Sequence, residues 1–316
     1  MNIVILDRGS LGEDTPFDGL EALGDVTSYF SSTQAEAIER VKYAEVIIIN
    51  KVKITEEVIA AAPRLRLVCV FATGFDNIDI SAARERGIGV CNVPGYSTPS
   101  VAQFTVATVL SLYSHLSEYN EFVRSGEYTR AGVPNRLIPV YHEIAGKTWG
   151  IVGYGNIGSA VARIADAMGA RVIVNKRTRT EDYTWVDIDT LCREADIITI
   201  HCPLNDESRE LINEDRIAMM KKDVVIVNAA RGAVLCEEDV ADAVKKGSIG
   251  AFGADVYSVE PFGEGHPFDS IKGLPNVLLT PHAAWGSYEA RVRCINTICS
   301  NIKAFFDGKI QNRVDI

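Results

Sequence analysis

Short apolar runs alternate with helix-like segments along nearly the whole 316-residue chain. Runs rich in valine, isoleucine and leucine occupy residues 3–6, 46–49, 67–71 and 89–91. Such continuous runs are typical of parallel strands that are covered on both faces. Helices are expected between them, around 33–43, 55–61 and 79–86, the last with Ser81 as its start signal and Gly87 as its stop. The pattern therefore predicts βαβ units and an α/β fold.

The alternation pauses at residues 92–99, where two prolines and a glycine mark a chain crossing. Ser100 is followed three residues later by Gln103, which is a capping-box spacing, so a helix is expected over 101–123. This segment is apolar on nearly every side through Tyr113. We therefore expect it to be buried between domains or subunits. The segment 127–145 shows no clear period.

A second alternation begins at Thr148. Its expected strands are 148–152, 171–175, 196–201, 223–228, 250–254 and 276–280, and its expected helices lie near 156–168, 187–194, 213–220 and 237–246. A last helical segment, 286–307, could return to the first half. Because domains average roughly 150 residues, we predict two α/β domains, a discontinuous one of 1–98 with 287–316 and a second of 99–286.

The composition restricts the partners and the compartment. With 32 basic and 42 acidic side chains, the formal charge is −10, which argues against nucleic acid because phosphate backbones bind clustered lysine and arginine. No stretch approaches the roughly 18 apolar residues of a membrane span, and the N-terminus lacks the basic region of a signal peptide. Seven widely spaced cysteines without a Cys-x-x-Cys pair suit reduced thiols. We expect a cytoplasmic protein that needs no metal ion.

A glycine-rich motif, G-x-G-x-x-G, directly follows the expected strand 148–152 and begins a helix-like segment. In this context the motif predicts dinucleotide binding. The first glycine allows the tight turn, the second lets the backbone approach a pyrophosphate, and the third lets the helix pack close to the strand. The N–H groups at the helix start would face the phosphate oxygens. The alternative interpretation of the motif is a glycine-rich turn that fits a tight strand-to-helix corner without binding a ligand. The predicted cofactor residues are Gly153, Gly155, Asn156, Ile157 and Gly158.

The strand 171–175 should end where an NAD enzyme carries an acidic residue for the adenosine ribose. Three cations and no carboxylate follow it instead, namely Lys176, Arg177 and Arg179. Arginine can bind a phosphate bidentately, whereas a carboxylate would repel one. The run therefore predicts a preference for NADP, with NAD as a possible cofactor. The alternative is a solvated charge run in a surface loop.

Three later segments each place a polar side chain just beyond the end of an expected strand. They are Asn228-Ala229-Ala230-Arg231-Gly232, the stretch from Asp255 to Glu260-Pro261, and Thr280-Pro281-His282. In open parallel sheets, the carboxyl ends of the strands form the edge where ligands bind. The three segments are therefore candidates for one ligand site.

These motifs, in this order and spacing, resemble the D-isomer-specific 2-hydroxyacid dehydrogenase family over nearly the whole chain. Residues 71–79 and 282–285 are most similar to its glycerate dehydrogenase, hydroxypyruvate reductase and glyoxylate reductase branch. The resemblance implies a flavodoxin-like substrate domain in the discontinuous part, a Rossmann-type doubly wound cofactor domain over 99–286, and a cleft between them. It also implies a homodimer joined through the cofactor domain.

Hydride reduction of a 2-keto acid needs a cation for the carboxylate, a proton donor for the developing alkoxide and a hydride source. The resemblance assigns the cation to Arg231, whose planar guanidinium matches a carboxylate and can polarise the keto oxygen. It assigns the proton donor to His282, because imidazole has a reference pKa of about 6.5, near working pH. Glu260 would fix the tautomer of this histidine and favour its protonated form.

The resemblance also implies further contacts. Ala229 and Asp255 would lie at the cofactor, Asp255 near the nicotinamide, and backbone N–H groups of the loop after strand 67–71 would contact the substrate carboxylate. Trp285 is expected either in the core or over the substrate pocket. The predicted substrate residues are Thr73, Gly74, Phe75, Arg231 and Trp285.

The leading hypothesis is a reductase of small 2-keto acids, of the hydroxypyruvate and glyoxylate class, that yields the D-hydroxy acid. A dehydrogenase for a bulkier 2-keto acid is an alternative on the same chemistry. The related formate dehydrogenases have glutamine in place of Glu260, which counts against them. A nucleotide-sensing interaction protein also stays open, because corepressors of this fold keep the catalytic residues.

Overall fold

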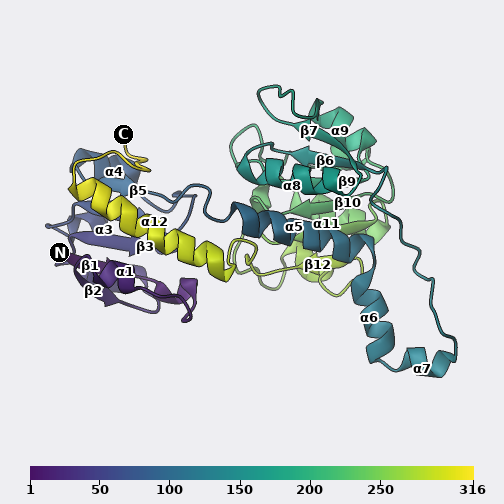
Figure 1. Ribbon diagram of the computed structural model, residues 1–316, viewed down its shortest axis with the longest axis horizontal. Helices are drawn as coiled ribbons and strands as arrows, with labels where there is room; N and C mark the ends of the chain where they lie inside the picture. The colour runs from purple at the N-terminus through teal and green to yellow at the C-terminus, as the bar shows by residue number, and fades with distance from the viewer. The chain divides into compact units, whose positions relative to one another are not determined.

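The computed structural model describes residues 1–316. The chain forms two compact units, which we call unit 1 (Met1–Ser97 with Gly286–Ile316) and unit 2 (Thr98–Trp285) (Figure 1). Each boundary lies one residue from the division expected from the sequence. Both units contain one wholly parallel sheet with helices packed against it, so the predicted α/β fold class is confirmed.

Unit 1 is built on a five-stranded sheet with the strand order β2-β1-β3-β4-β5. Its strands are β1 (Asn2–Ile5), β2 (Asp25–Ser28), β3 (Val46–Ile49), β4 (Leu67–Val70) and β5 (Gly89–Cys91). Four of them match the predicted apolar runs to within one residue. β2 is a largely exposed edge strand without an apolar run, and the pattern of apolar residues therefore does not reveal it.

The helices of unit 1 are η1 (Arg8–Leu11), α1 (Asp18–Glu21), α2 (Gln34–Arg40), α3 (Glu56–Ala60), α4 (Ile80–Glu85) and α12 (Tyr288–Phe306). The expectation that Ser81 starts α4 is wrong. Asp79 caps this helix instead, because its carboxylate accepts a hydrogen bond from the backbone of Ala82 at 2.9 Å. α12 packs against β4, β5 and α1, so the last helical segment does return to the first half of the chain.

Unit 2 is built on a seven-stranded sheet with the strand order β12-β11-β10-β9-β6-β7-β8. Its strands are β6 (Thr148–Val152), β7 (Arg171–Asn175), β8 (Thr184–Trp185), β9 (Ile197–Ile200), β10 (Val225–Asn228), β11 (Ala251–Ala254) and β12 (Val277–Leu279). Only the two-residue strand β8 was not expected. The order turns back at β6, which pairs with β9 on one side and with β7 on the other.

The helices of unit 2 are α5 (Thr98–Tyr113), α6 (Leu116–Arg124), α7 (Glu127–Ala131), α8 (Asn156–Ala167), α9 (Ile188–Glu194), α10 (Glu214–Ile217), η2 (Gly232–Val234), α11 (Glu237–Lys246) and η3 (Pro267–Ser270). α7 lies in the segment for which no period was visible. It is a single exposed turn without buried residues, so it leaves no apolar signal.

The single helix expected over 101–123 is wrong in two respects. It begins earlier, at Thr98, so Ser100 lies inside the first turn, where its hydroxyl donates to the carbonyl of Ala284 at 2.6 Å. It is also broken at His115, whose φ of 52° lies in the left-handed region, and α6 follows. α5 packs against α8 and strands β10 and β11 of its own unit, while Gln103 and Ala107 on this helix are exposed.

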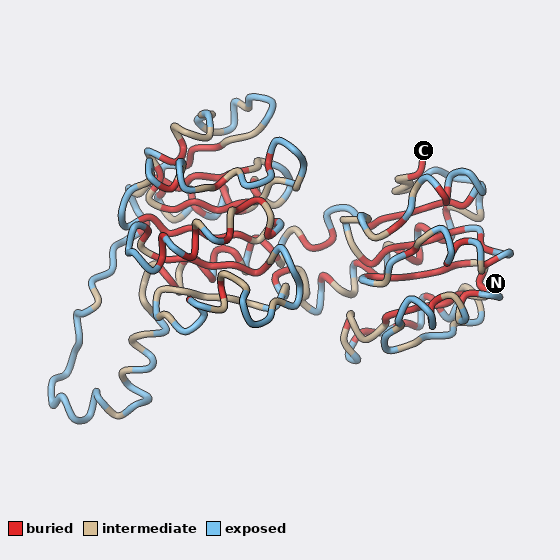
Figure 2. The backbone as a smooth tube through the Cα atoms, turned by 180° about the vertical axis from the view of Figure 1, so that it is seen from behind, coloured by how far each residue is buried: buried red, intermediate tan, exposed pale blue.

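The buried residues follow the strands of each sheet, as the red segments of Figure 2 show. Residues 116–141, which we call the arm, are different: α6 and α7 contain no buried residue, and most of the arm is drawn as exposed. No helix in the chain combines the length and the apolar character that crossing a bilayer requires.

Candidate active site

The carboxyl edge of the unit 2 sheet carries most of the predicted site. β6 leads into the glycine loop, β10 leads to Arg231, β11 leads to Asp255 and Glu260, and β12 leads to His282. Because all strands of this sheet are parallel, these segments emerge at the same edge. The strand order reverses beside β6, and ligands of open α/β sheets bind at such a switch point. The topology therefore places the glycine loop where a dinucleotide is expected.

The three glycines of the loop have different surroundings. Gly153 has a φ of 90°, and a Cβ there would lie 2.4 Å from the backbone nitrogen of Cys202. A Cβ on Gly158 would lie 2.1 Å from the carbonyl oxygen of Gly153, so the loop and α8 approach each other closely. Beside Gly155, in contrast, there is open space. No side chain caps α8 at Gly155, so the N–H groups that begin the helix with Asn156 can bind an anion.

Two of the three cations after β7 lie beside aromatic rings. The ammonium of Lys176 lies 5.7 Å from the ring centre of Tyr154, inside the glycine loop, and the guanidinium of Arg179 lies 4.6 Å from the ring of Trp185. Arg177 is 80% exposed and only 3.9 Å from a carboxylate oxygen of the equally exposed Glu207. The cations are thus accessible to a ligand at the glycine loop.

Arg231 follows β10 in an extended conformation and is exposed. Buried Asn228 shapes the turn, because its amide donates to the carbonyl of Arg231 at 2.9 Å and its side-chain oxygen accepts from the backbone of Ala230 at 3.0 Å. The guanidinium donates through Nη1 to the carbonyl of Ala230 at 2.8 Å. Its other nitrogens have no hydrogen bond within the protein. Ala229 lies in the same turn and is half-buried.

His282 and Glu260 form a close pair. Nδ1 of the imidazole lies 2.7 Å from Oε2 of the carboxylate, and each side chain is about 30% exposed. A carboxylate only accepts hydrogen bonds, so Nδ1 carries the proton and Nε2 is the nitrogen that can exchange one. Oε1 of Glu260 accepts from the backbone of Tyr257 at 3.1 Å. His282 has a φ of 53°, a strained conformation for a non-glycine residue.

Asp255 holds the loop that carries His282. Its buried carboxylate accepts from the hydroxyl of Thr280 at 2.7 Å and from the backbones of Ala283 and Ala284 at 2.8 and 2.9 Å. Burial raises the pKa of Asp255, whereas these hydrogen bonds and the charge of His282 oppose the rise. The structure thus shows a loop-holding role for this residue, and its predicted contact with the nicotinamide stays a prediction.

The predicted substrate loop lies in unit 1, after β4. The hydroxyl of Thr73 donates to the carbonyl of Val93 at 2.9 Å, and its own carbonyl accepts from the amide of Asn92 at 2.8 Å. Gly74 and Phe75 follow in the same loop and are half-buried. Trp285, at the end of unit 2, is half-buried as well. The predicted substrate contacts of all four residues stay predictions.

Two residues without a predicted catalytic role shape these edges. Buried Asp7 accepts from the backbones of Asn50, Lys51 and Val52 and so fixes the loop after β3. His201 follows β9 beside the glycine loop, and both of its ring nitrogens are buried without a hydrogen-bond partner. Burial lowers the pKa of His201 to about 3, so this histidine is neutral. From the sequence, the place of His201 at a strand end, just before Cys202, indicates a position near the cofactor without a chemical role, whereas no sequence pattern indicates the role of Asp7.

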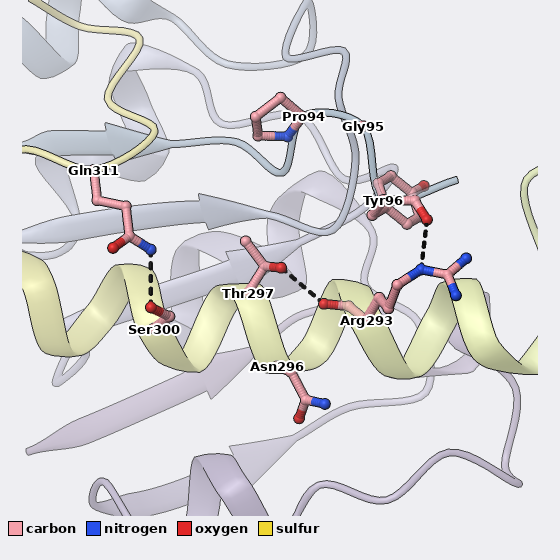
Figure 3. Close-up of a pocket in the computed structure, with 8 residues that line it drawn as sticks. All are labelled: Pro94, Gly95, Tyr96, Arg293, Asn296, Thr297, Ser300 and Gln311. Carbon is pink, nitrogen blue, oxygen red and sulfur yellow. Dashed lines mark hydrogen bonds between the residues drawn. The ribbon is translucent and has the colours of Figure 1, made fainter. Parts of the chain in front are cut away.

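A cavity of about 440 Å³ lies elsewhere in unit 1, between residues 94–96 and one face of α12 (Figure 3). Arg293 lines it and donates through Nε to the carbonyl of Tyr96 at 3.0 Å. The other lining groups on α12 are small and polar, such as Thr297 and Ser300. No predicted catalytic, cofactor or substrate residue takes part in this cavity.

Comparisons with known proteins agree with this geometry. The family model described as D-isomer specific 2-hydroxyacid dehydrogenase, NAD binding domain, matches residues 106–284. A hydroxypyruvate reductase of Blautia hydrogenotrophica is 36% identical over the full length of both chains. A glyoxylate reductase of Aeropyrum pernix is 40% identical over 263 residues, which cover 80% of this chain and 77% of the relative.

Solved structures share the fold over nearly the whole chain. A D-lactate dehydrogenase from Aquifex aeolicus, complexed with NAD and lactic acid, has a TM-score of 0.87 and 28% identity, and the match covers 100% of this chain and 99% of the other. An acyclic imino acid reductase in complex with NADPH and D-Arg has a TM-score of 0.85 and 29% identity, with 99% and 100% covered.

The fold and these matches define a dinucleotide-binding α/β enzyme. More narrowly, the chain belongs to the D-isomer specific 2-hydroxyacid dehydrogenase family. At the level that the family sets, it is an NAD(P)-dependent 2-hydroxyacid dehydrogenase.

Proposed function

We propose that the chain reduces a small 2-keto acid, of the hydroxypyruvate and glyoxylate class, to the D-2-hydroxy acid with NADPH, and that NADH can replace NADPH. The observation that carries the proposal is the 2.7 Å pair of His282 and Glu260, on the same sheet edge as the glycine loop. The relatives named hydroxypyruvate reductase and glyoxylate reductase support the substrate class.

The histidine would supply the proton. Because Nδ1 is engaged by Glu260, protonated His282 donates from Nε2 to the oxygen of the keto group as negative charge develops there. The carboxylate of Glu260 stabilises the positive charge before the transfer and keeps the ring oriented afterwards. In the oxidative direction the neutral ring takes the proton back. Reduction therefore consumes one proton for each hydride transferred.

Arg231 would bind the substrate carboxylate. Only one of its guanidinium nitrogens donates within the protein, to the carbonyl of Ala230, so the others are available. A guanidinium can donate two parallel hydrogen bonds to a carboxylate, which fixes the direction of a 2-keto acid as well as its position. Asn228 holds the turn that presents this side chain.

The glycine loop fits a dinucleotide, since open space lies beside Gly155 and no side chain occupies the start of α8. When bound, the nicotinamide supplies the hydride that reduces the keto carbon. The loop would hold the pyrophosphate, and Lys176, Arg177 and Arg179 would bind a ribose 2′-phosphate. Their accessibility supports NADPH as the preferred cofactor. One solved relative is in complex with NADPH and another with NAD. The kcat/KM values of this protein with NADPH and with NADH therefore test the cofactor preference.

The arm supports a homodimer. It exposes large apolar side chains, among them Leu137 at 74%, Ile138 at 69% and Val140 at 68%. Neighbouring apolar side chains that are exposed together can mark a protein–protein interaction surface. A second copy of this chain is the partner that we propose, and sedimentation of the purified protein tests it.

A panel of 2-keto acids, assayed with each cofactor, tests the proposed substrate. We expect the highest kcat/KM for glyoxylate or hydroxypyruvate. Higher values for 2-keto acids with longer side chains would instead support a dehydrogenase of bulkier acids. Tight NADPH binding without turnover of any 2-keto acid would refute the proposal and favour a nucleotide-sensing protein.

A further inference from the structure

A second acid–histidine pair lies below the loop that carries Glu260. Glu237, at the start of α11, is only 5% exposed, although it carries a carboxylate. Its Oε1 accepts from the backbone of Ser258 at 2.9 Å, and its Oε2 accepts from the hydroxyl of the same serine. A buried carboxylate is unfavourable unless its lone pairs are satisfied. This one directs both of its oxygens at a single residue of the Glu260 loop.

His266 approaches the carboxylate of Glu237 as a second neighbour besides Ser258. Its Nε2 lies 3.0 Å from Oε2 of Glu237, without the alignment of a regular hydrogen bond. Its Nδ1 accepts from the backbone of Phe268 at 3.2 Å, so the proton of the neutral ring lies on Nε2, toward the carboxylate. The ring stacks on Phe262 with 4.8 Å between centres and meets Tyr257 edge-on. His266 is thereby fixed in position.

The segment that Glu237 holds is where the loops of the proposed catalytic residues meet. Tyr257 donates its backbone N–H to Glu260, and its hydroxyl donates to the carbonyl of Thr280, two residues before His282, at 2.8 Å. Gly232, next to Arg231, packs directly on this segment, because a Cβ there would lie 2.0 Å from the carbonyl carbon of Tyr257. Residues 257–258 therefore touch all three loops.

We propose that Glu237 is a positioning residue: with His266 behind it, it holds Ser258 and so keeps Glu260 at hydrogen-bond distance from His282. The inference rests on the proposed function for the catalytic roles of Glu260 and His282. Glu237 itself does not touch the imidazole. Within unit 2, Glu260 contacts the His282 ring and Asp255 interacts with it electrostatically, and only the first depends on Ser258.

The test compares Glu237→Gln with Glu238→Gln, which makes the same chemical change one residue further on, at an exposed side chain. For Glu237→Gln we expect kcat to fall about 10–100-fold, the range that a small displacement of catalytic groups produces. We also expect the kcat/KM profile for reduction to fall off at lower pH than in the wild type, since the carboxylate beside His282 is displaced. The Kd for NADPH should stay within about twofold, because the glycine loop is untouched.

Amide exchange of residues 256–262, measured without substrate, tests the anchoring separately from catalysis. It should be faster in Glu237→Gln and unchanged in Glu238→Gln. If Glu237→Gln does not fold, Ser258→Ala and Glu237→Asp carry the test: a several-fold loss of kcat in the first, and a smaller loss in the second, which keeps the carboxylate, support the proposal.

The proposal would be overturned if a folded Glu237→Gln protein showed the wild-type kcat and pH profile, even with faster loop exchange. If Glu237→Gln does not fold, the same result in Ser258→Ala would overturn it. A wild-type protein that turns over no 2-keto acid would refute the proposed function instead. The exchange result would still show whether Glu237 anchors the loop.

Discussion

Removing the charge from Lys176 and Arg177 should separate the two cofactors. Both residues directly follow Asn175, whose carbonyl accepts from the backbone of Gly153 in the glycine loop. Neither is held by a strong partner: the Arg177–Glu207 distance is 3.9 Å, and both of these groups are about 80% exposed. Such a surface pair contributes about 0–1 kcal/mol, so Arg177 can leave it for a phosphate at little cost.

The expected loss of kcat/KM with NADPH can be worked out from the exposure of the two side chains. A hydrogen bond to a charged group contributes about 1.5–3 kcal/mol, and solvent screening at these exposed positions reduces it to about 1–1.5 kcal/mol. Replacing both cations by alanine should therefore cost about 2–3 kcal/mol with NADPH. At about 1.4 kcal/mol per factor of ten, kcat/KM for NADPH should fall about 30–150-fold, whereas the value for NADH should stay within about threefold.

The assay is the initial rate of hydroxypyruvate reduction at 340 nm with each cofactor. Lys245→Ala/Lys246→Ala is the matched control, because it also removes two adjacent exposed cations, at the end of α11. It should leave both values near those of the wild type. Equal losses with NADPH and NADH in the Lys176/Arg177 variant would show that the run does not recognise the 2′-phosphate.

Three further predictions follow from the geometry. His282→Asn should lower kcat by about 10²–10⁴ with unchanged NADPH affinity; a loss below tenfold would contradict its role as proton donor. Since the pKa of His201 is lowered to about 3, the folded protein keeps it neutral while the unfolded chain binds a proton below about pH 6.5. Protonation linked to His201 should therefore lower stability progressively as the pH drops from about 6.5 toward 3, and urea unfolding of His201→Gln should lack this part of the loss. Leu137→Ser/Ile138→Ser should shift sedimentation from dimer to monomer, and an unchanged distribution would remove the arm from the interface.

The buried parts of the fold were readable from the sequence, because strands covered on both faces must be continuously apolar. Trp149 and its neighbours in β6 are an example, since every residue of that strand is buried. Exposed elements, such as β2 and α7, carry no comparable pattern. The break at His115 depends on one left-handed backbone conformation, which nothing in the surrounding residues demands.

The position of a candidate site residue was predictable where the residue directly follows a strand. Gly153, Arg231 and His282 each follow a strand of one parallel sheet, and the sheet brings them to one edge. The supporting contacts were not predictable, because they join residues distant in sequence by their side chains. Glu237 reaches Ser258 across 21 positions, and no local pattern indicates that an acid at a helix start is buried.

The most direct test of the account is the reaction itself. Purified protein is incubated with hydroxypyruvate or glyoxylate and NADPH, coenzyme oxidation is followed at 340 nm, and the hydroxypyruvate product is resolved on a chiral column. We expect one glycerate molecule of the D configuration for each NADPH oxidised, and loss of the reaction in His282→Asn. L-glycerate, or full turnover in His282→Asn, would contradict the proposed chemistry.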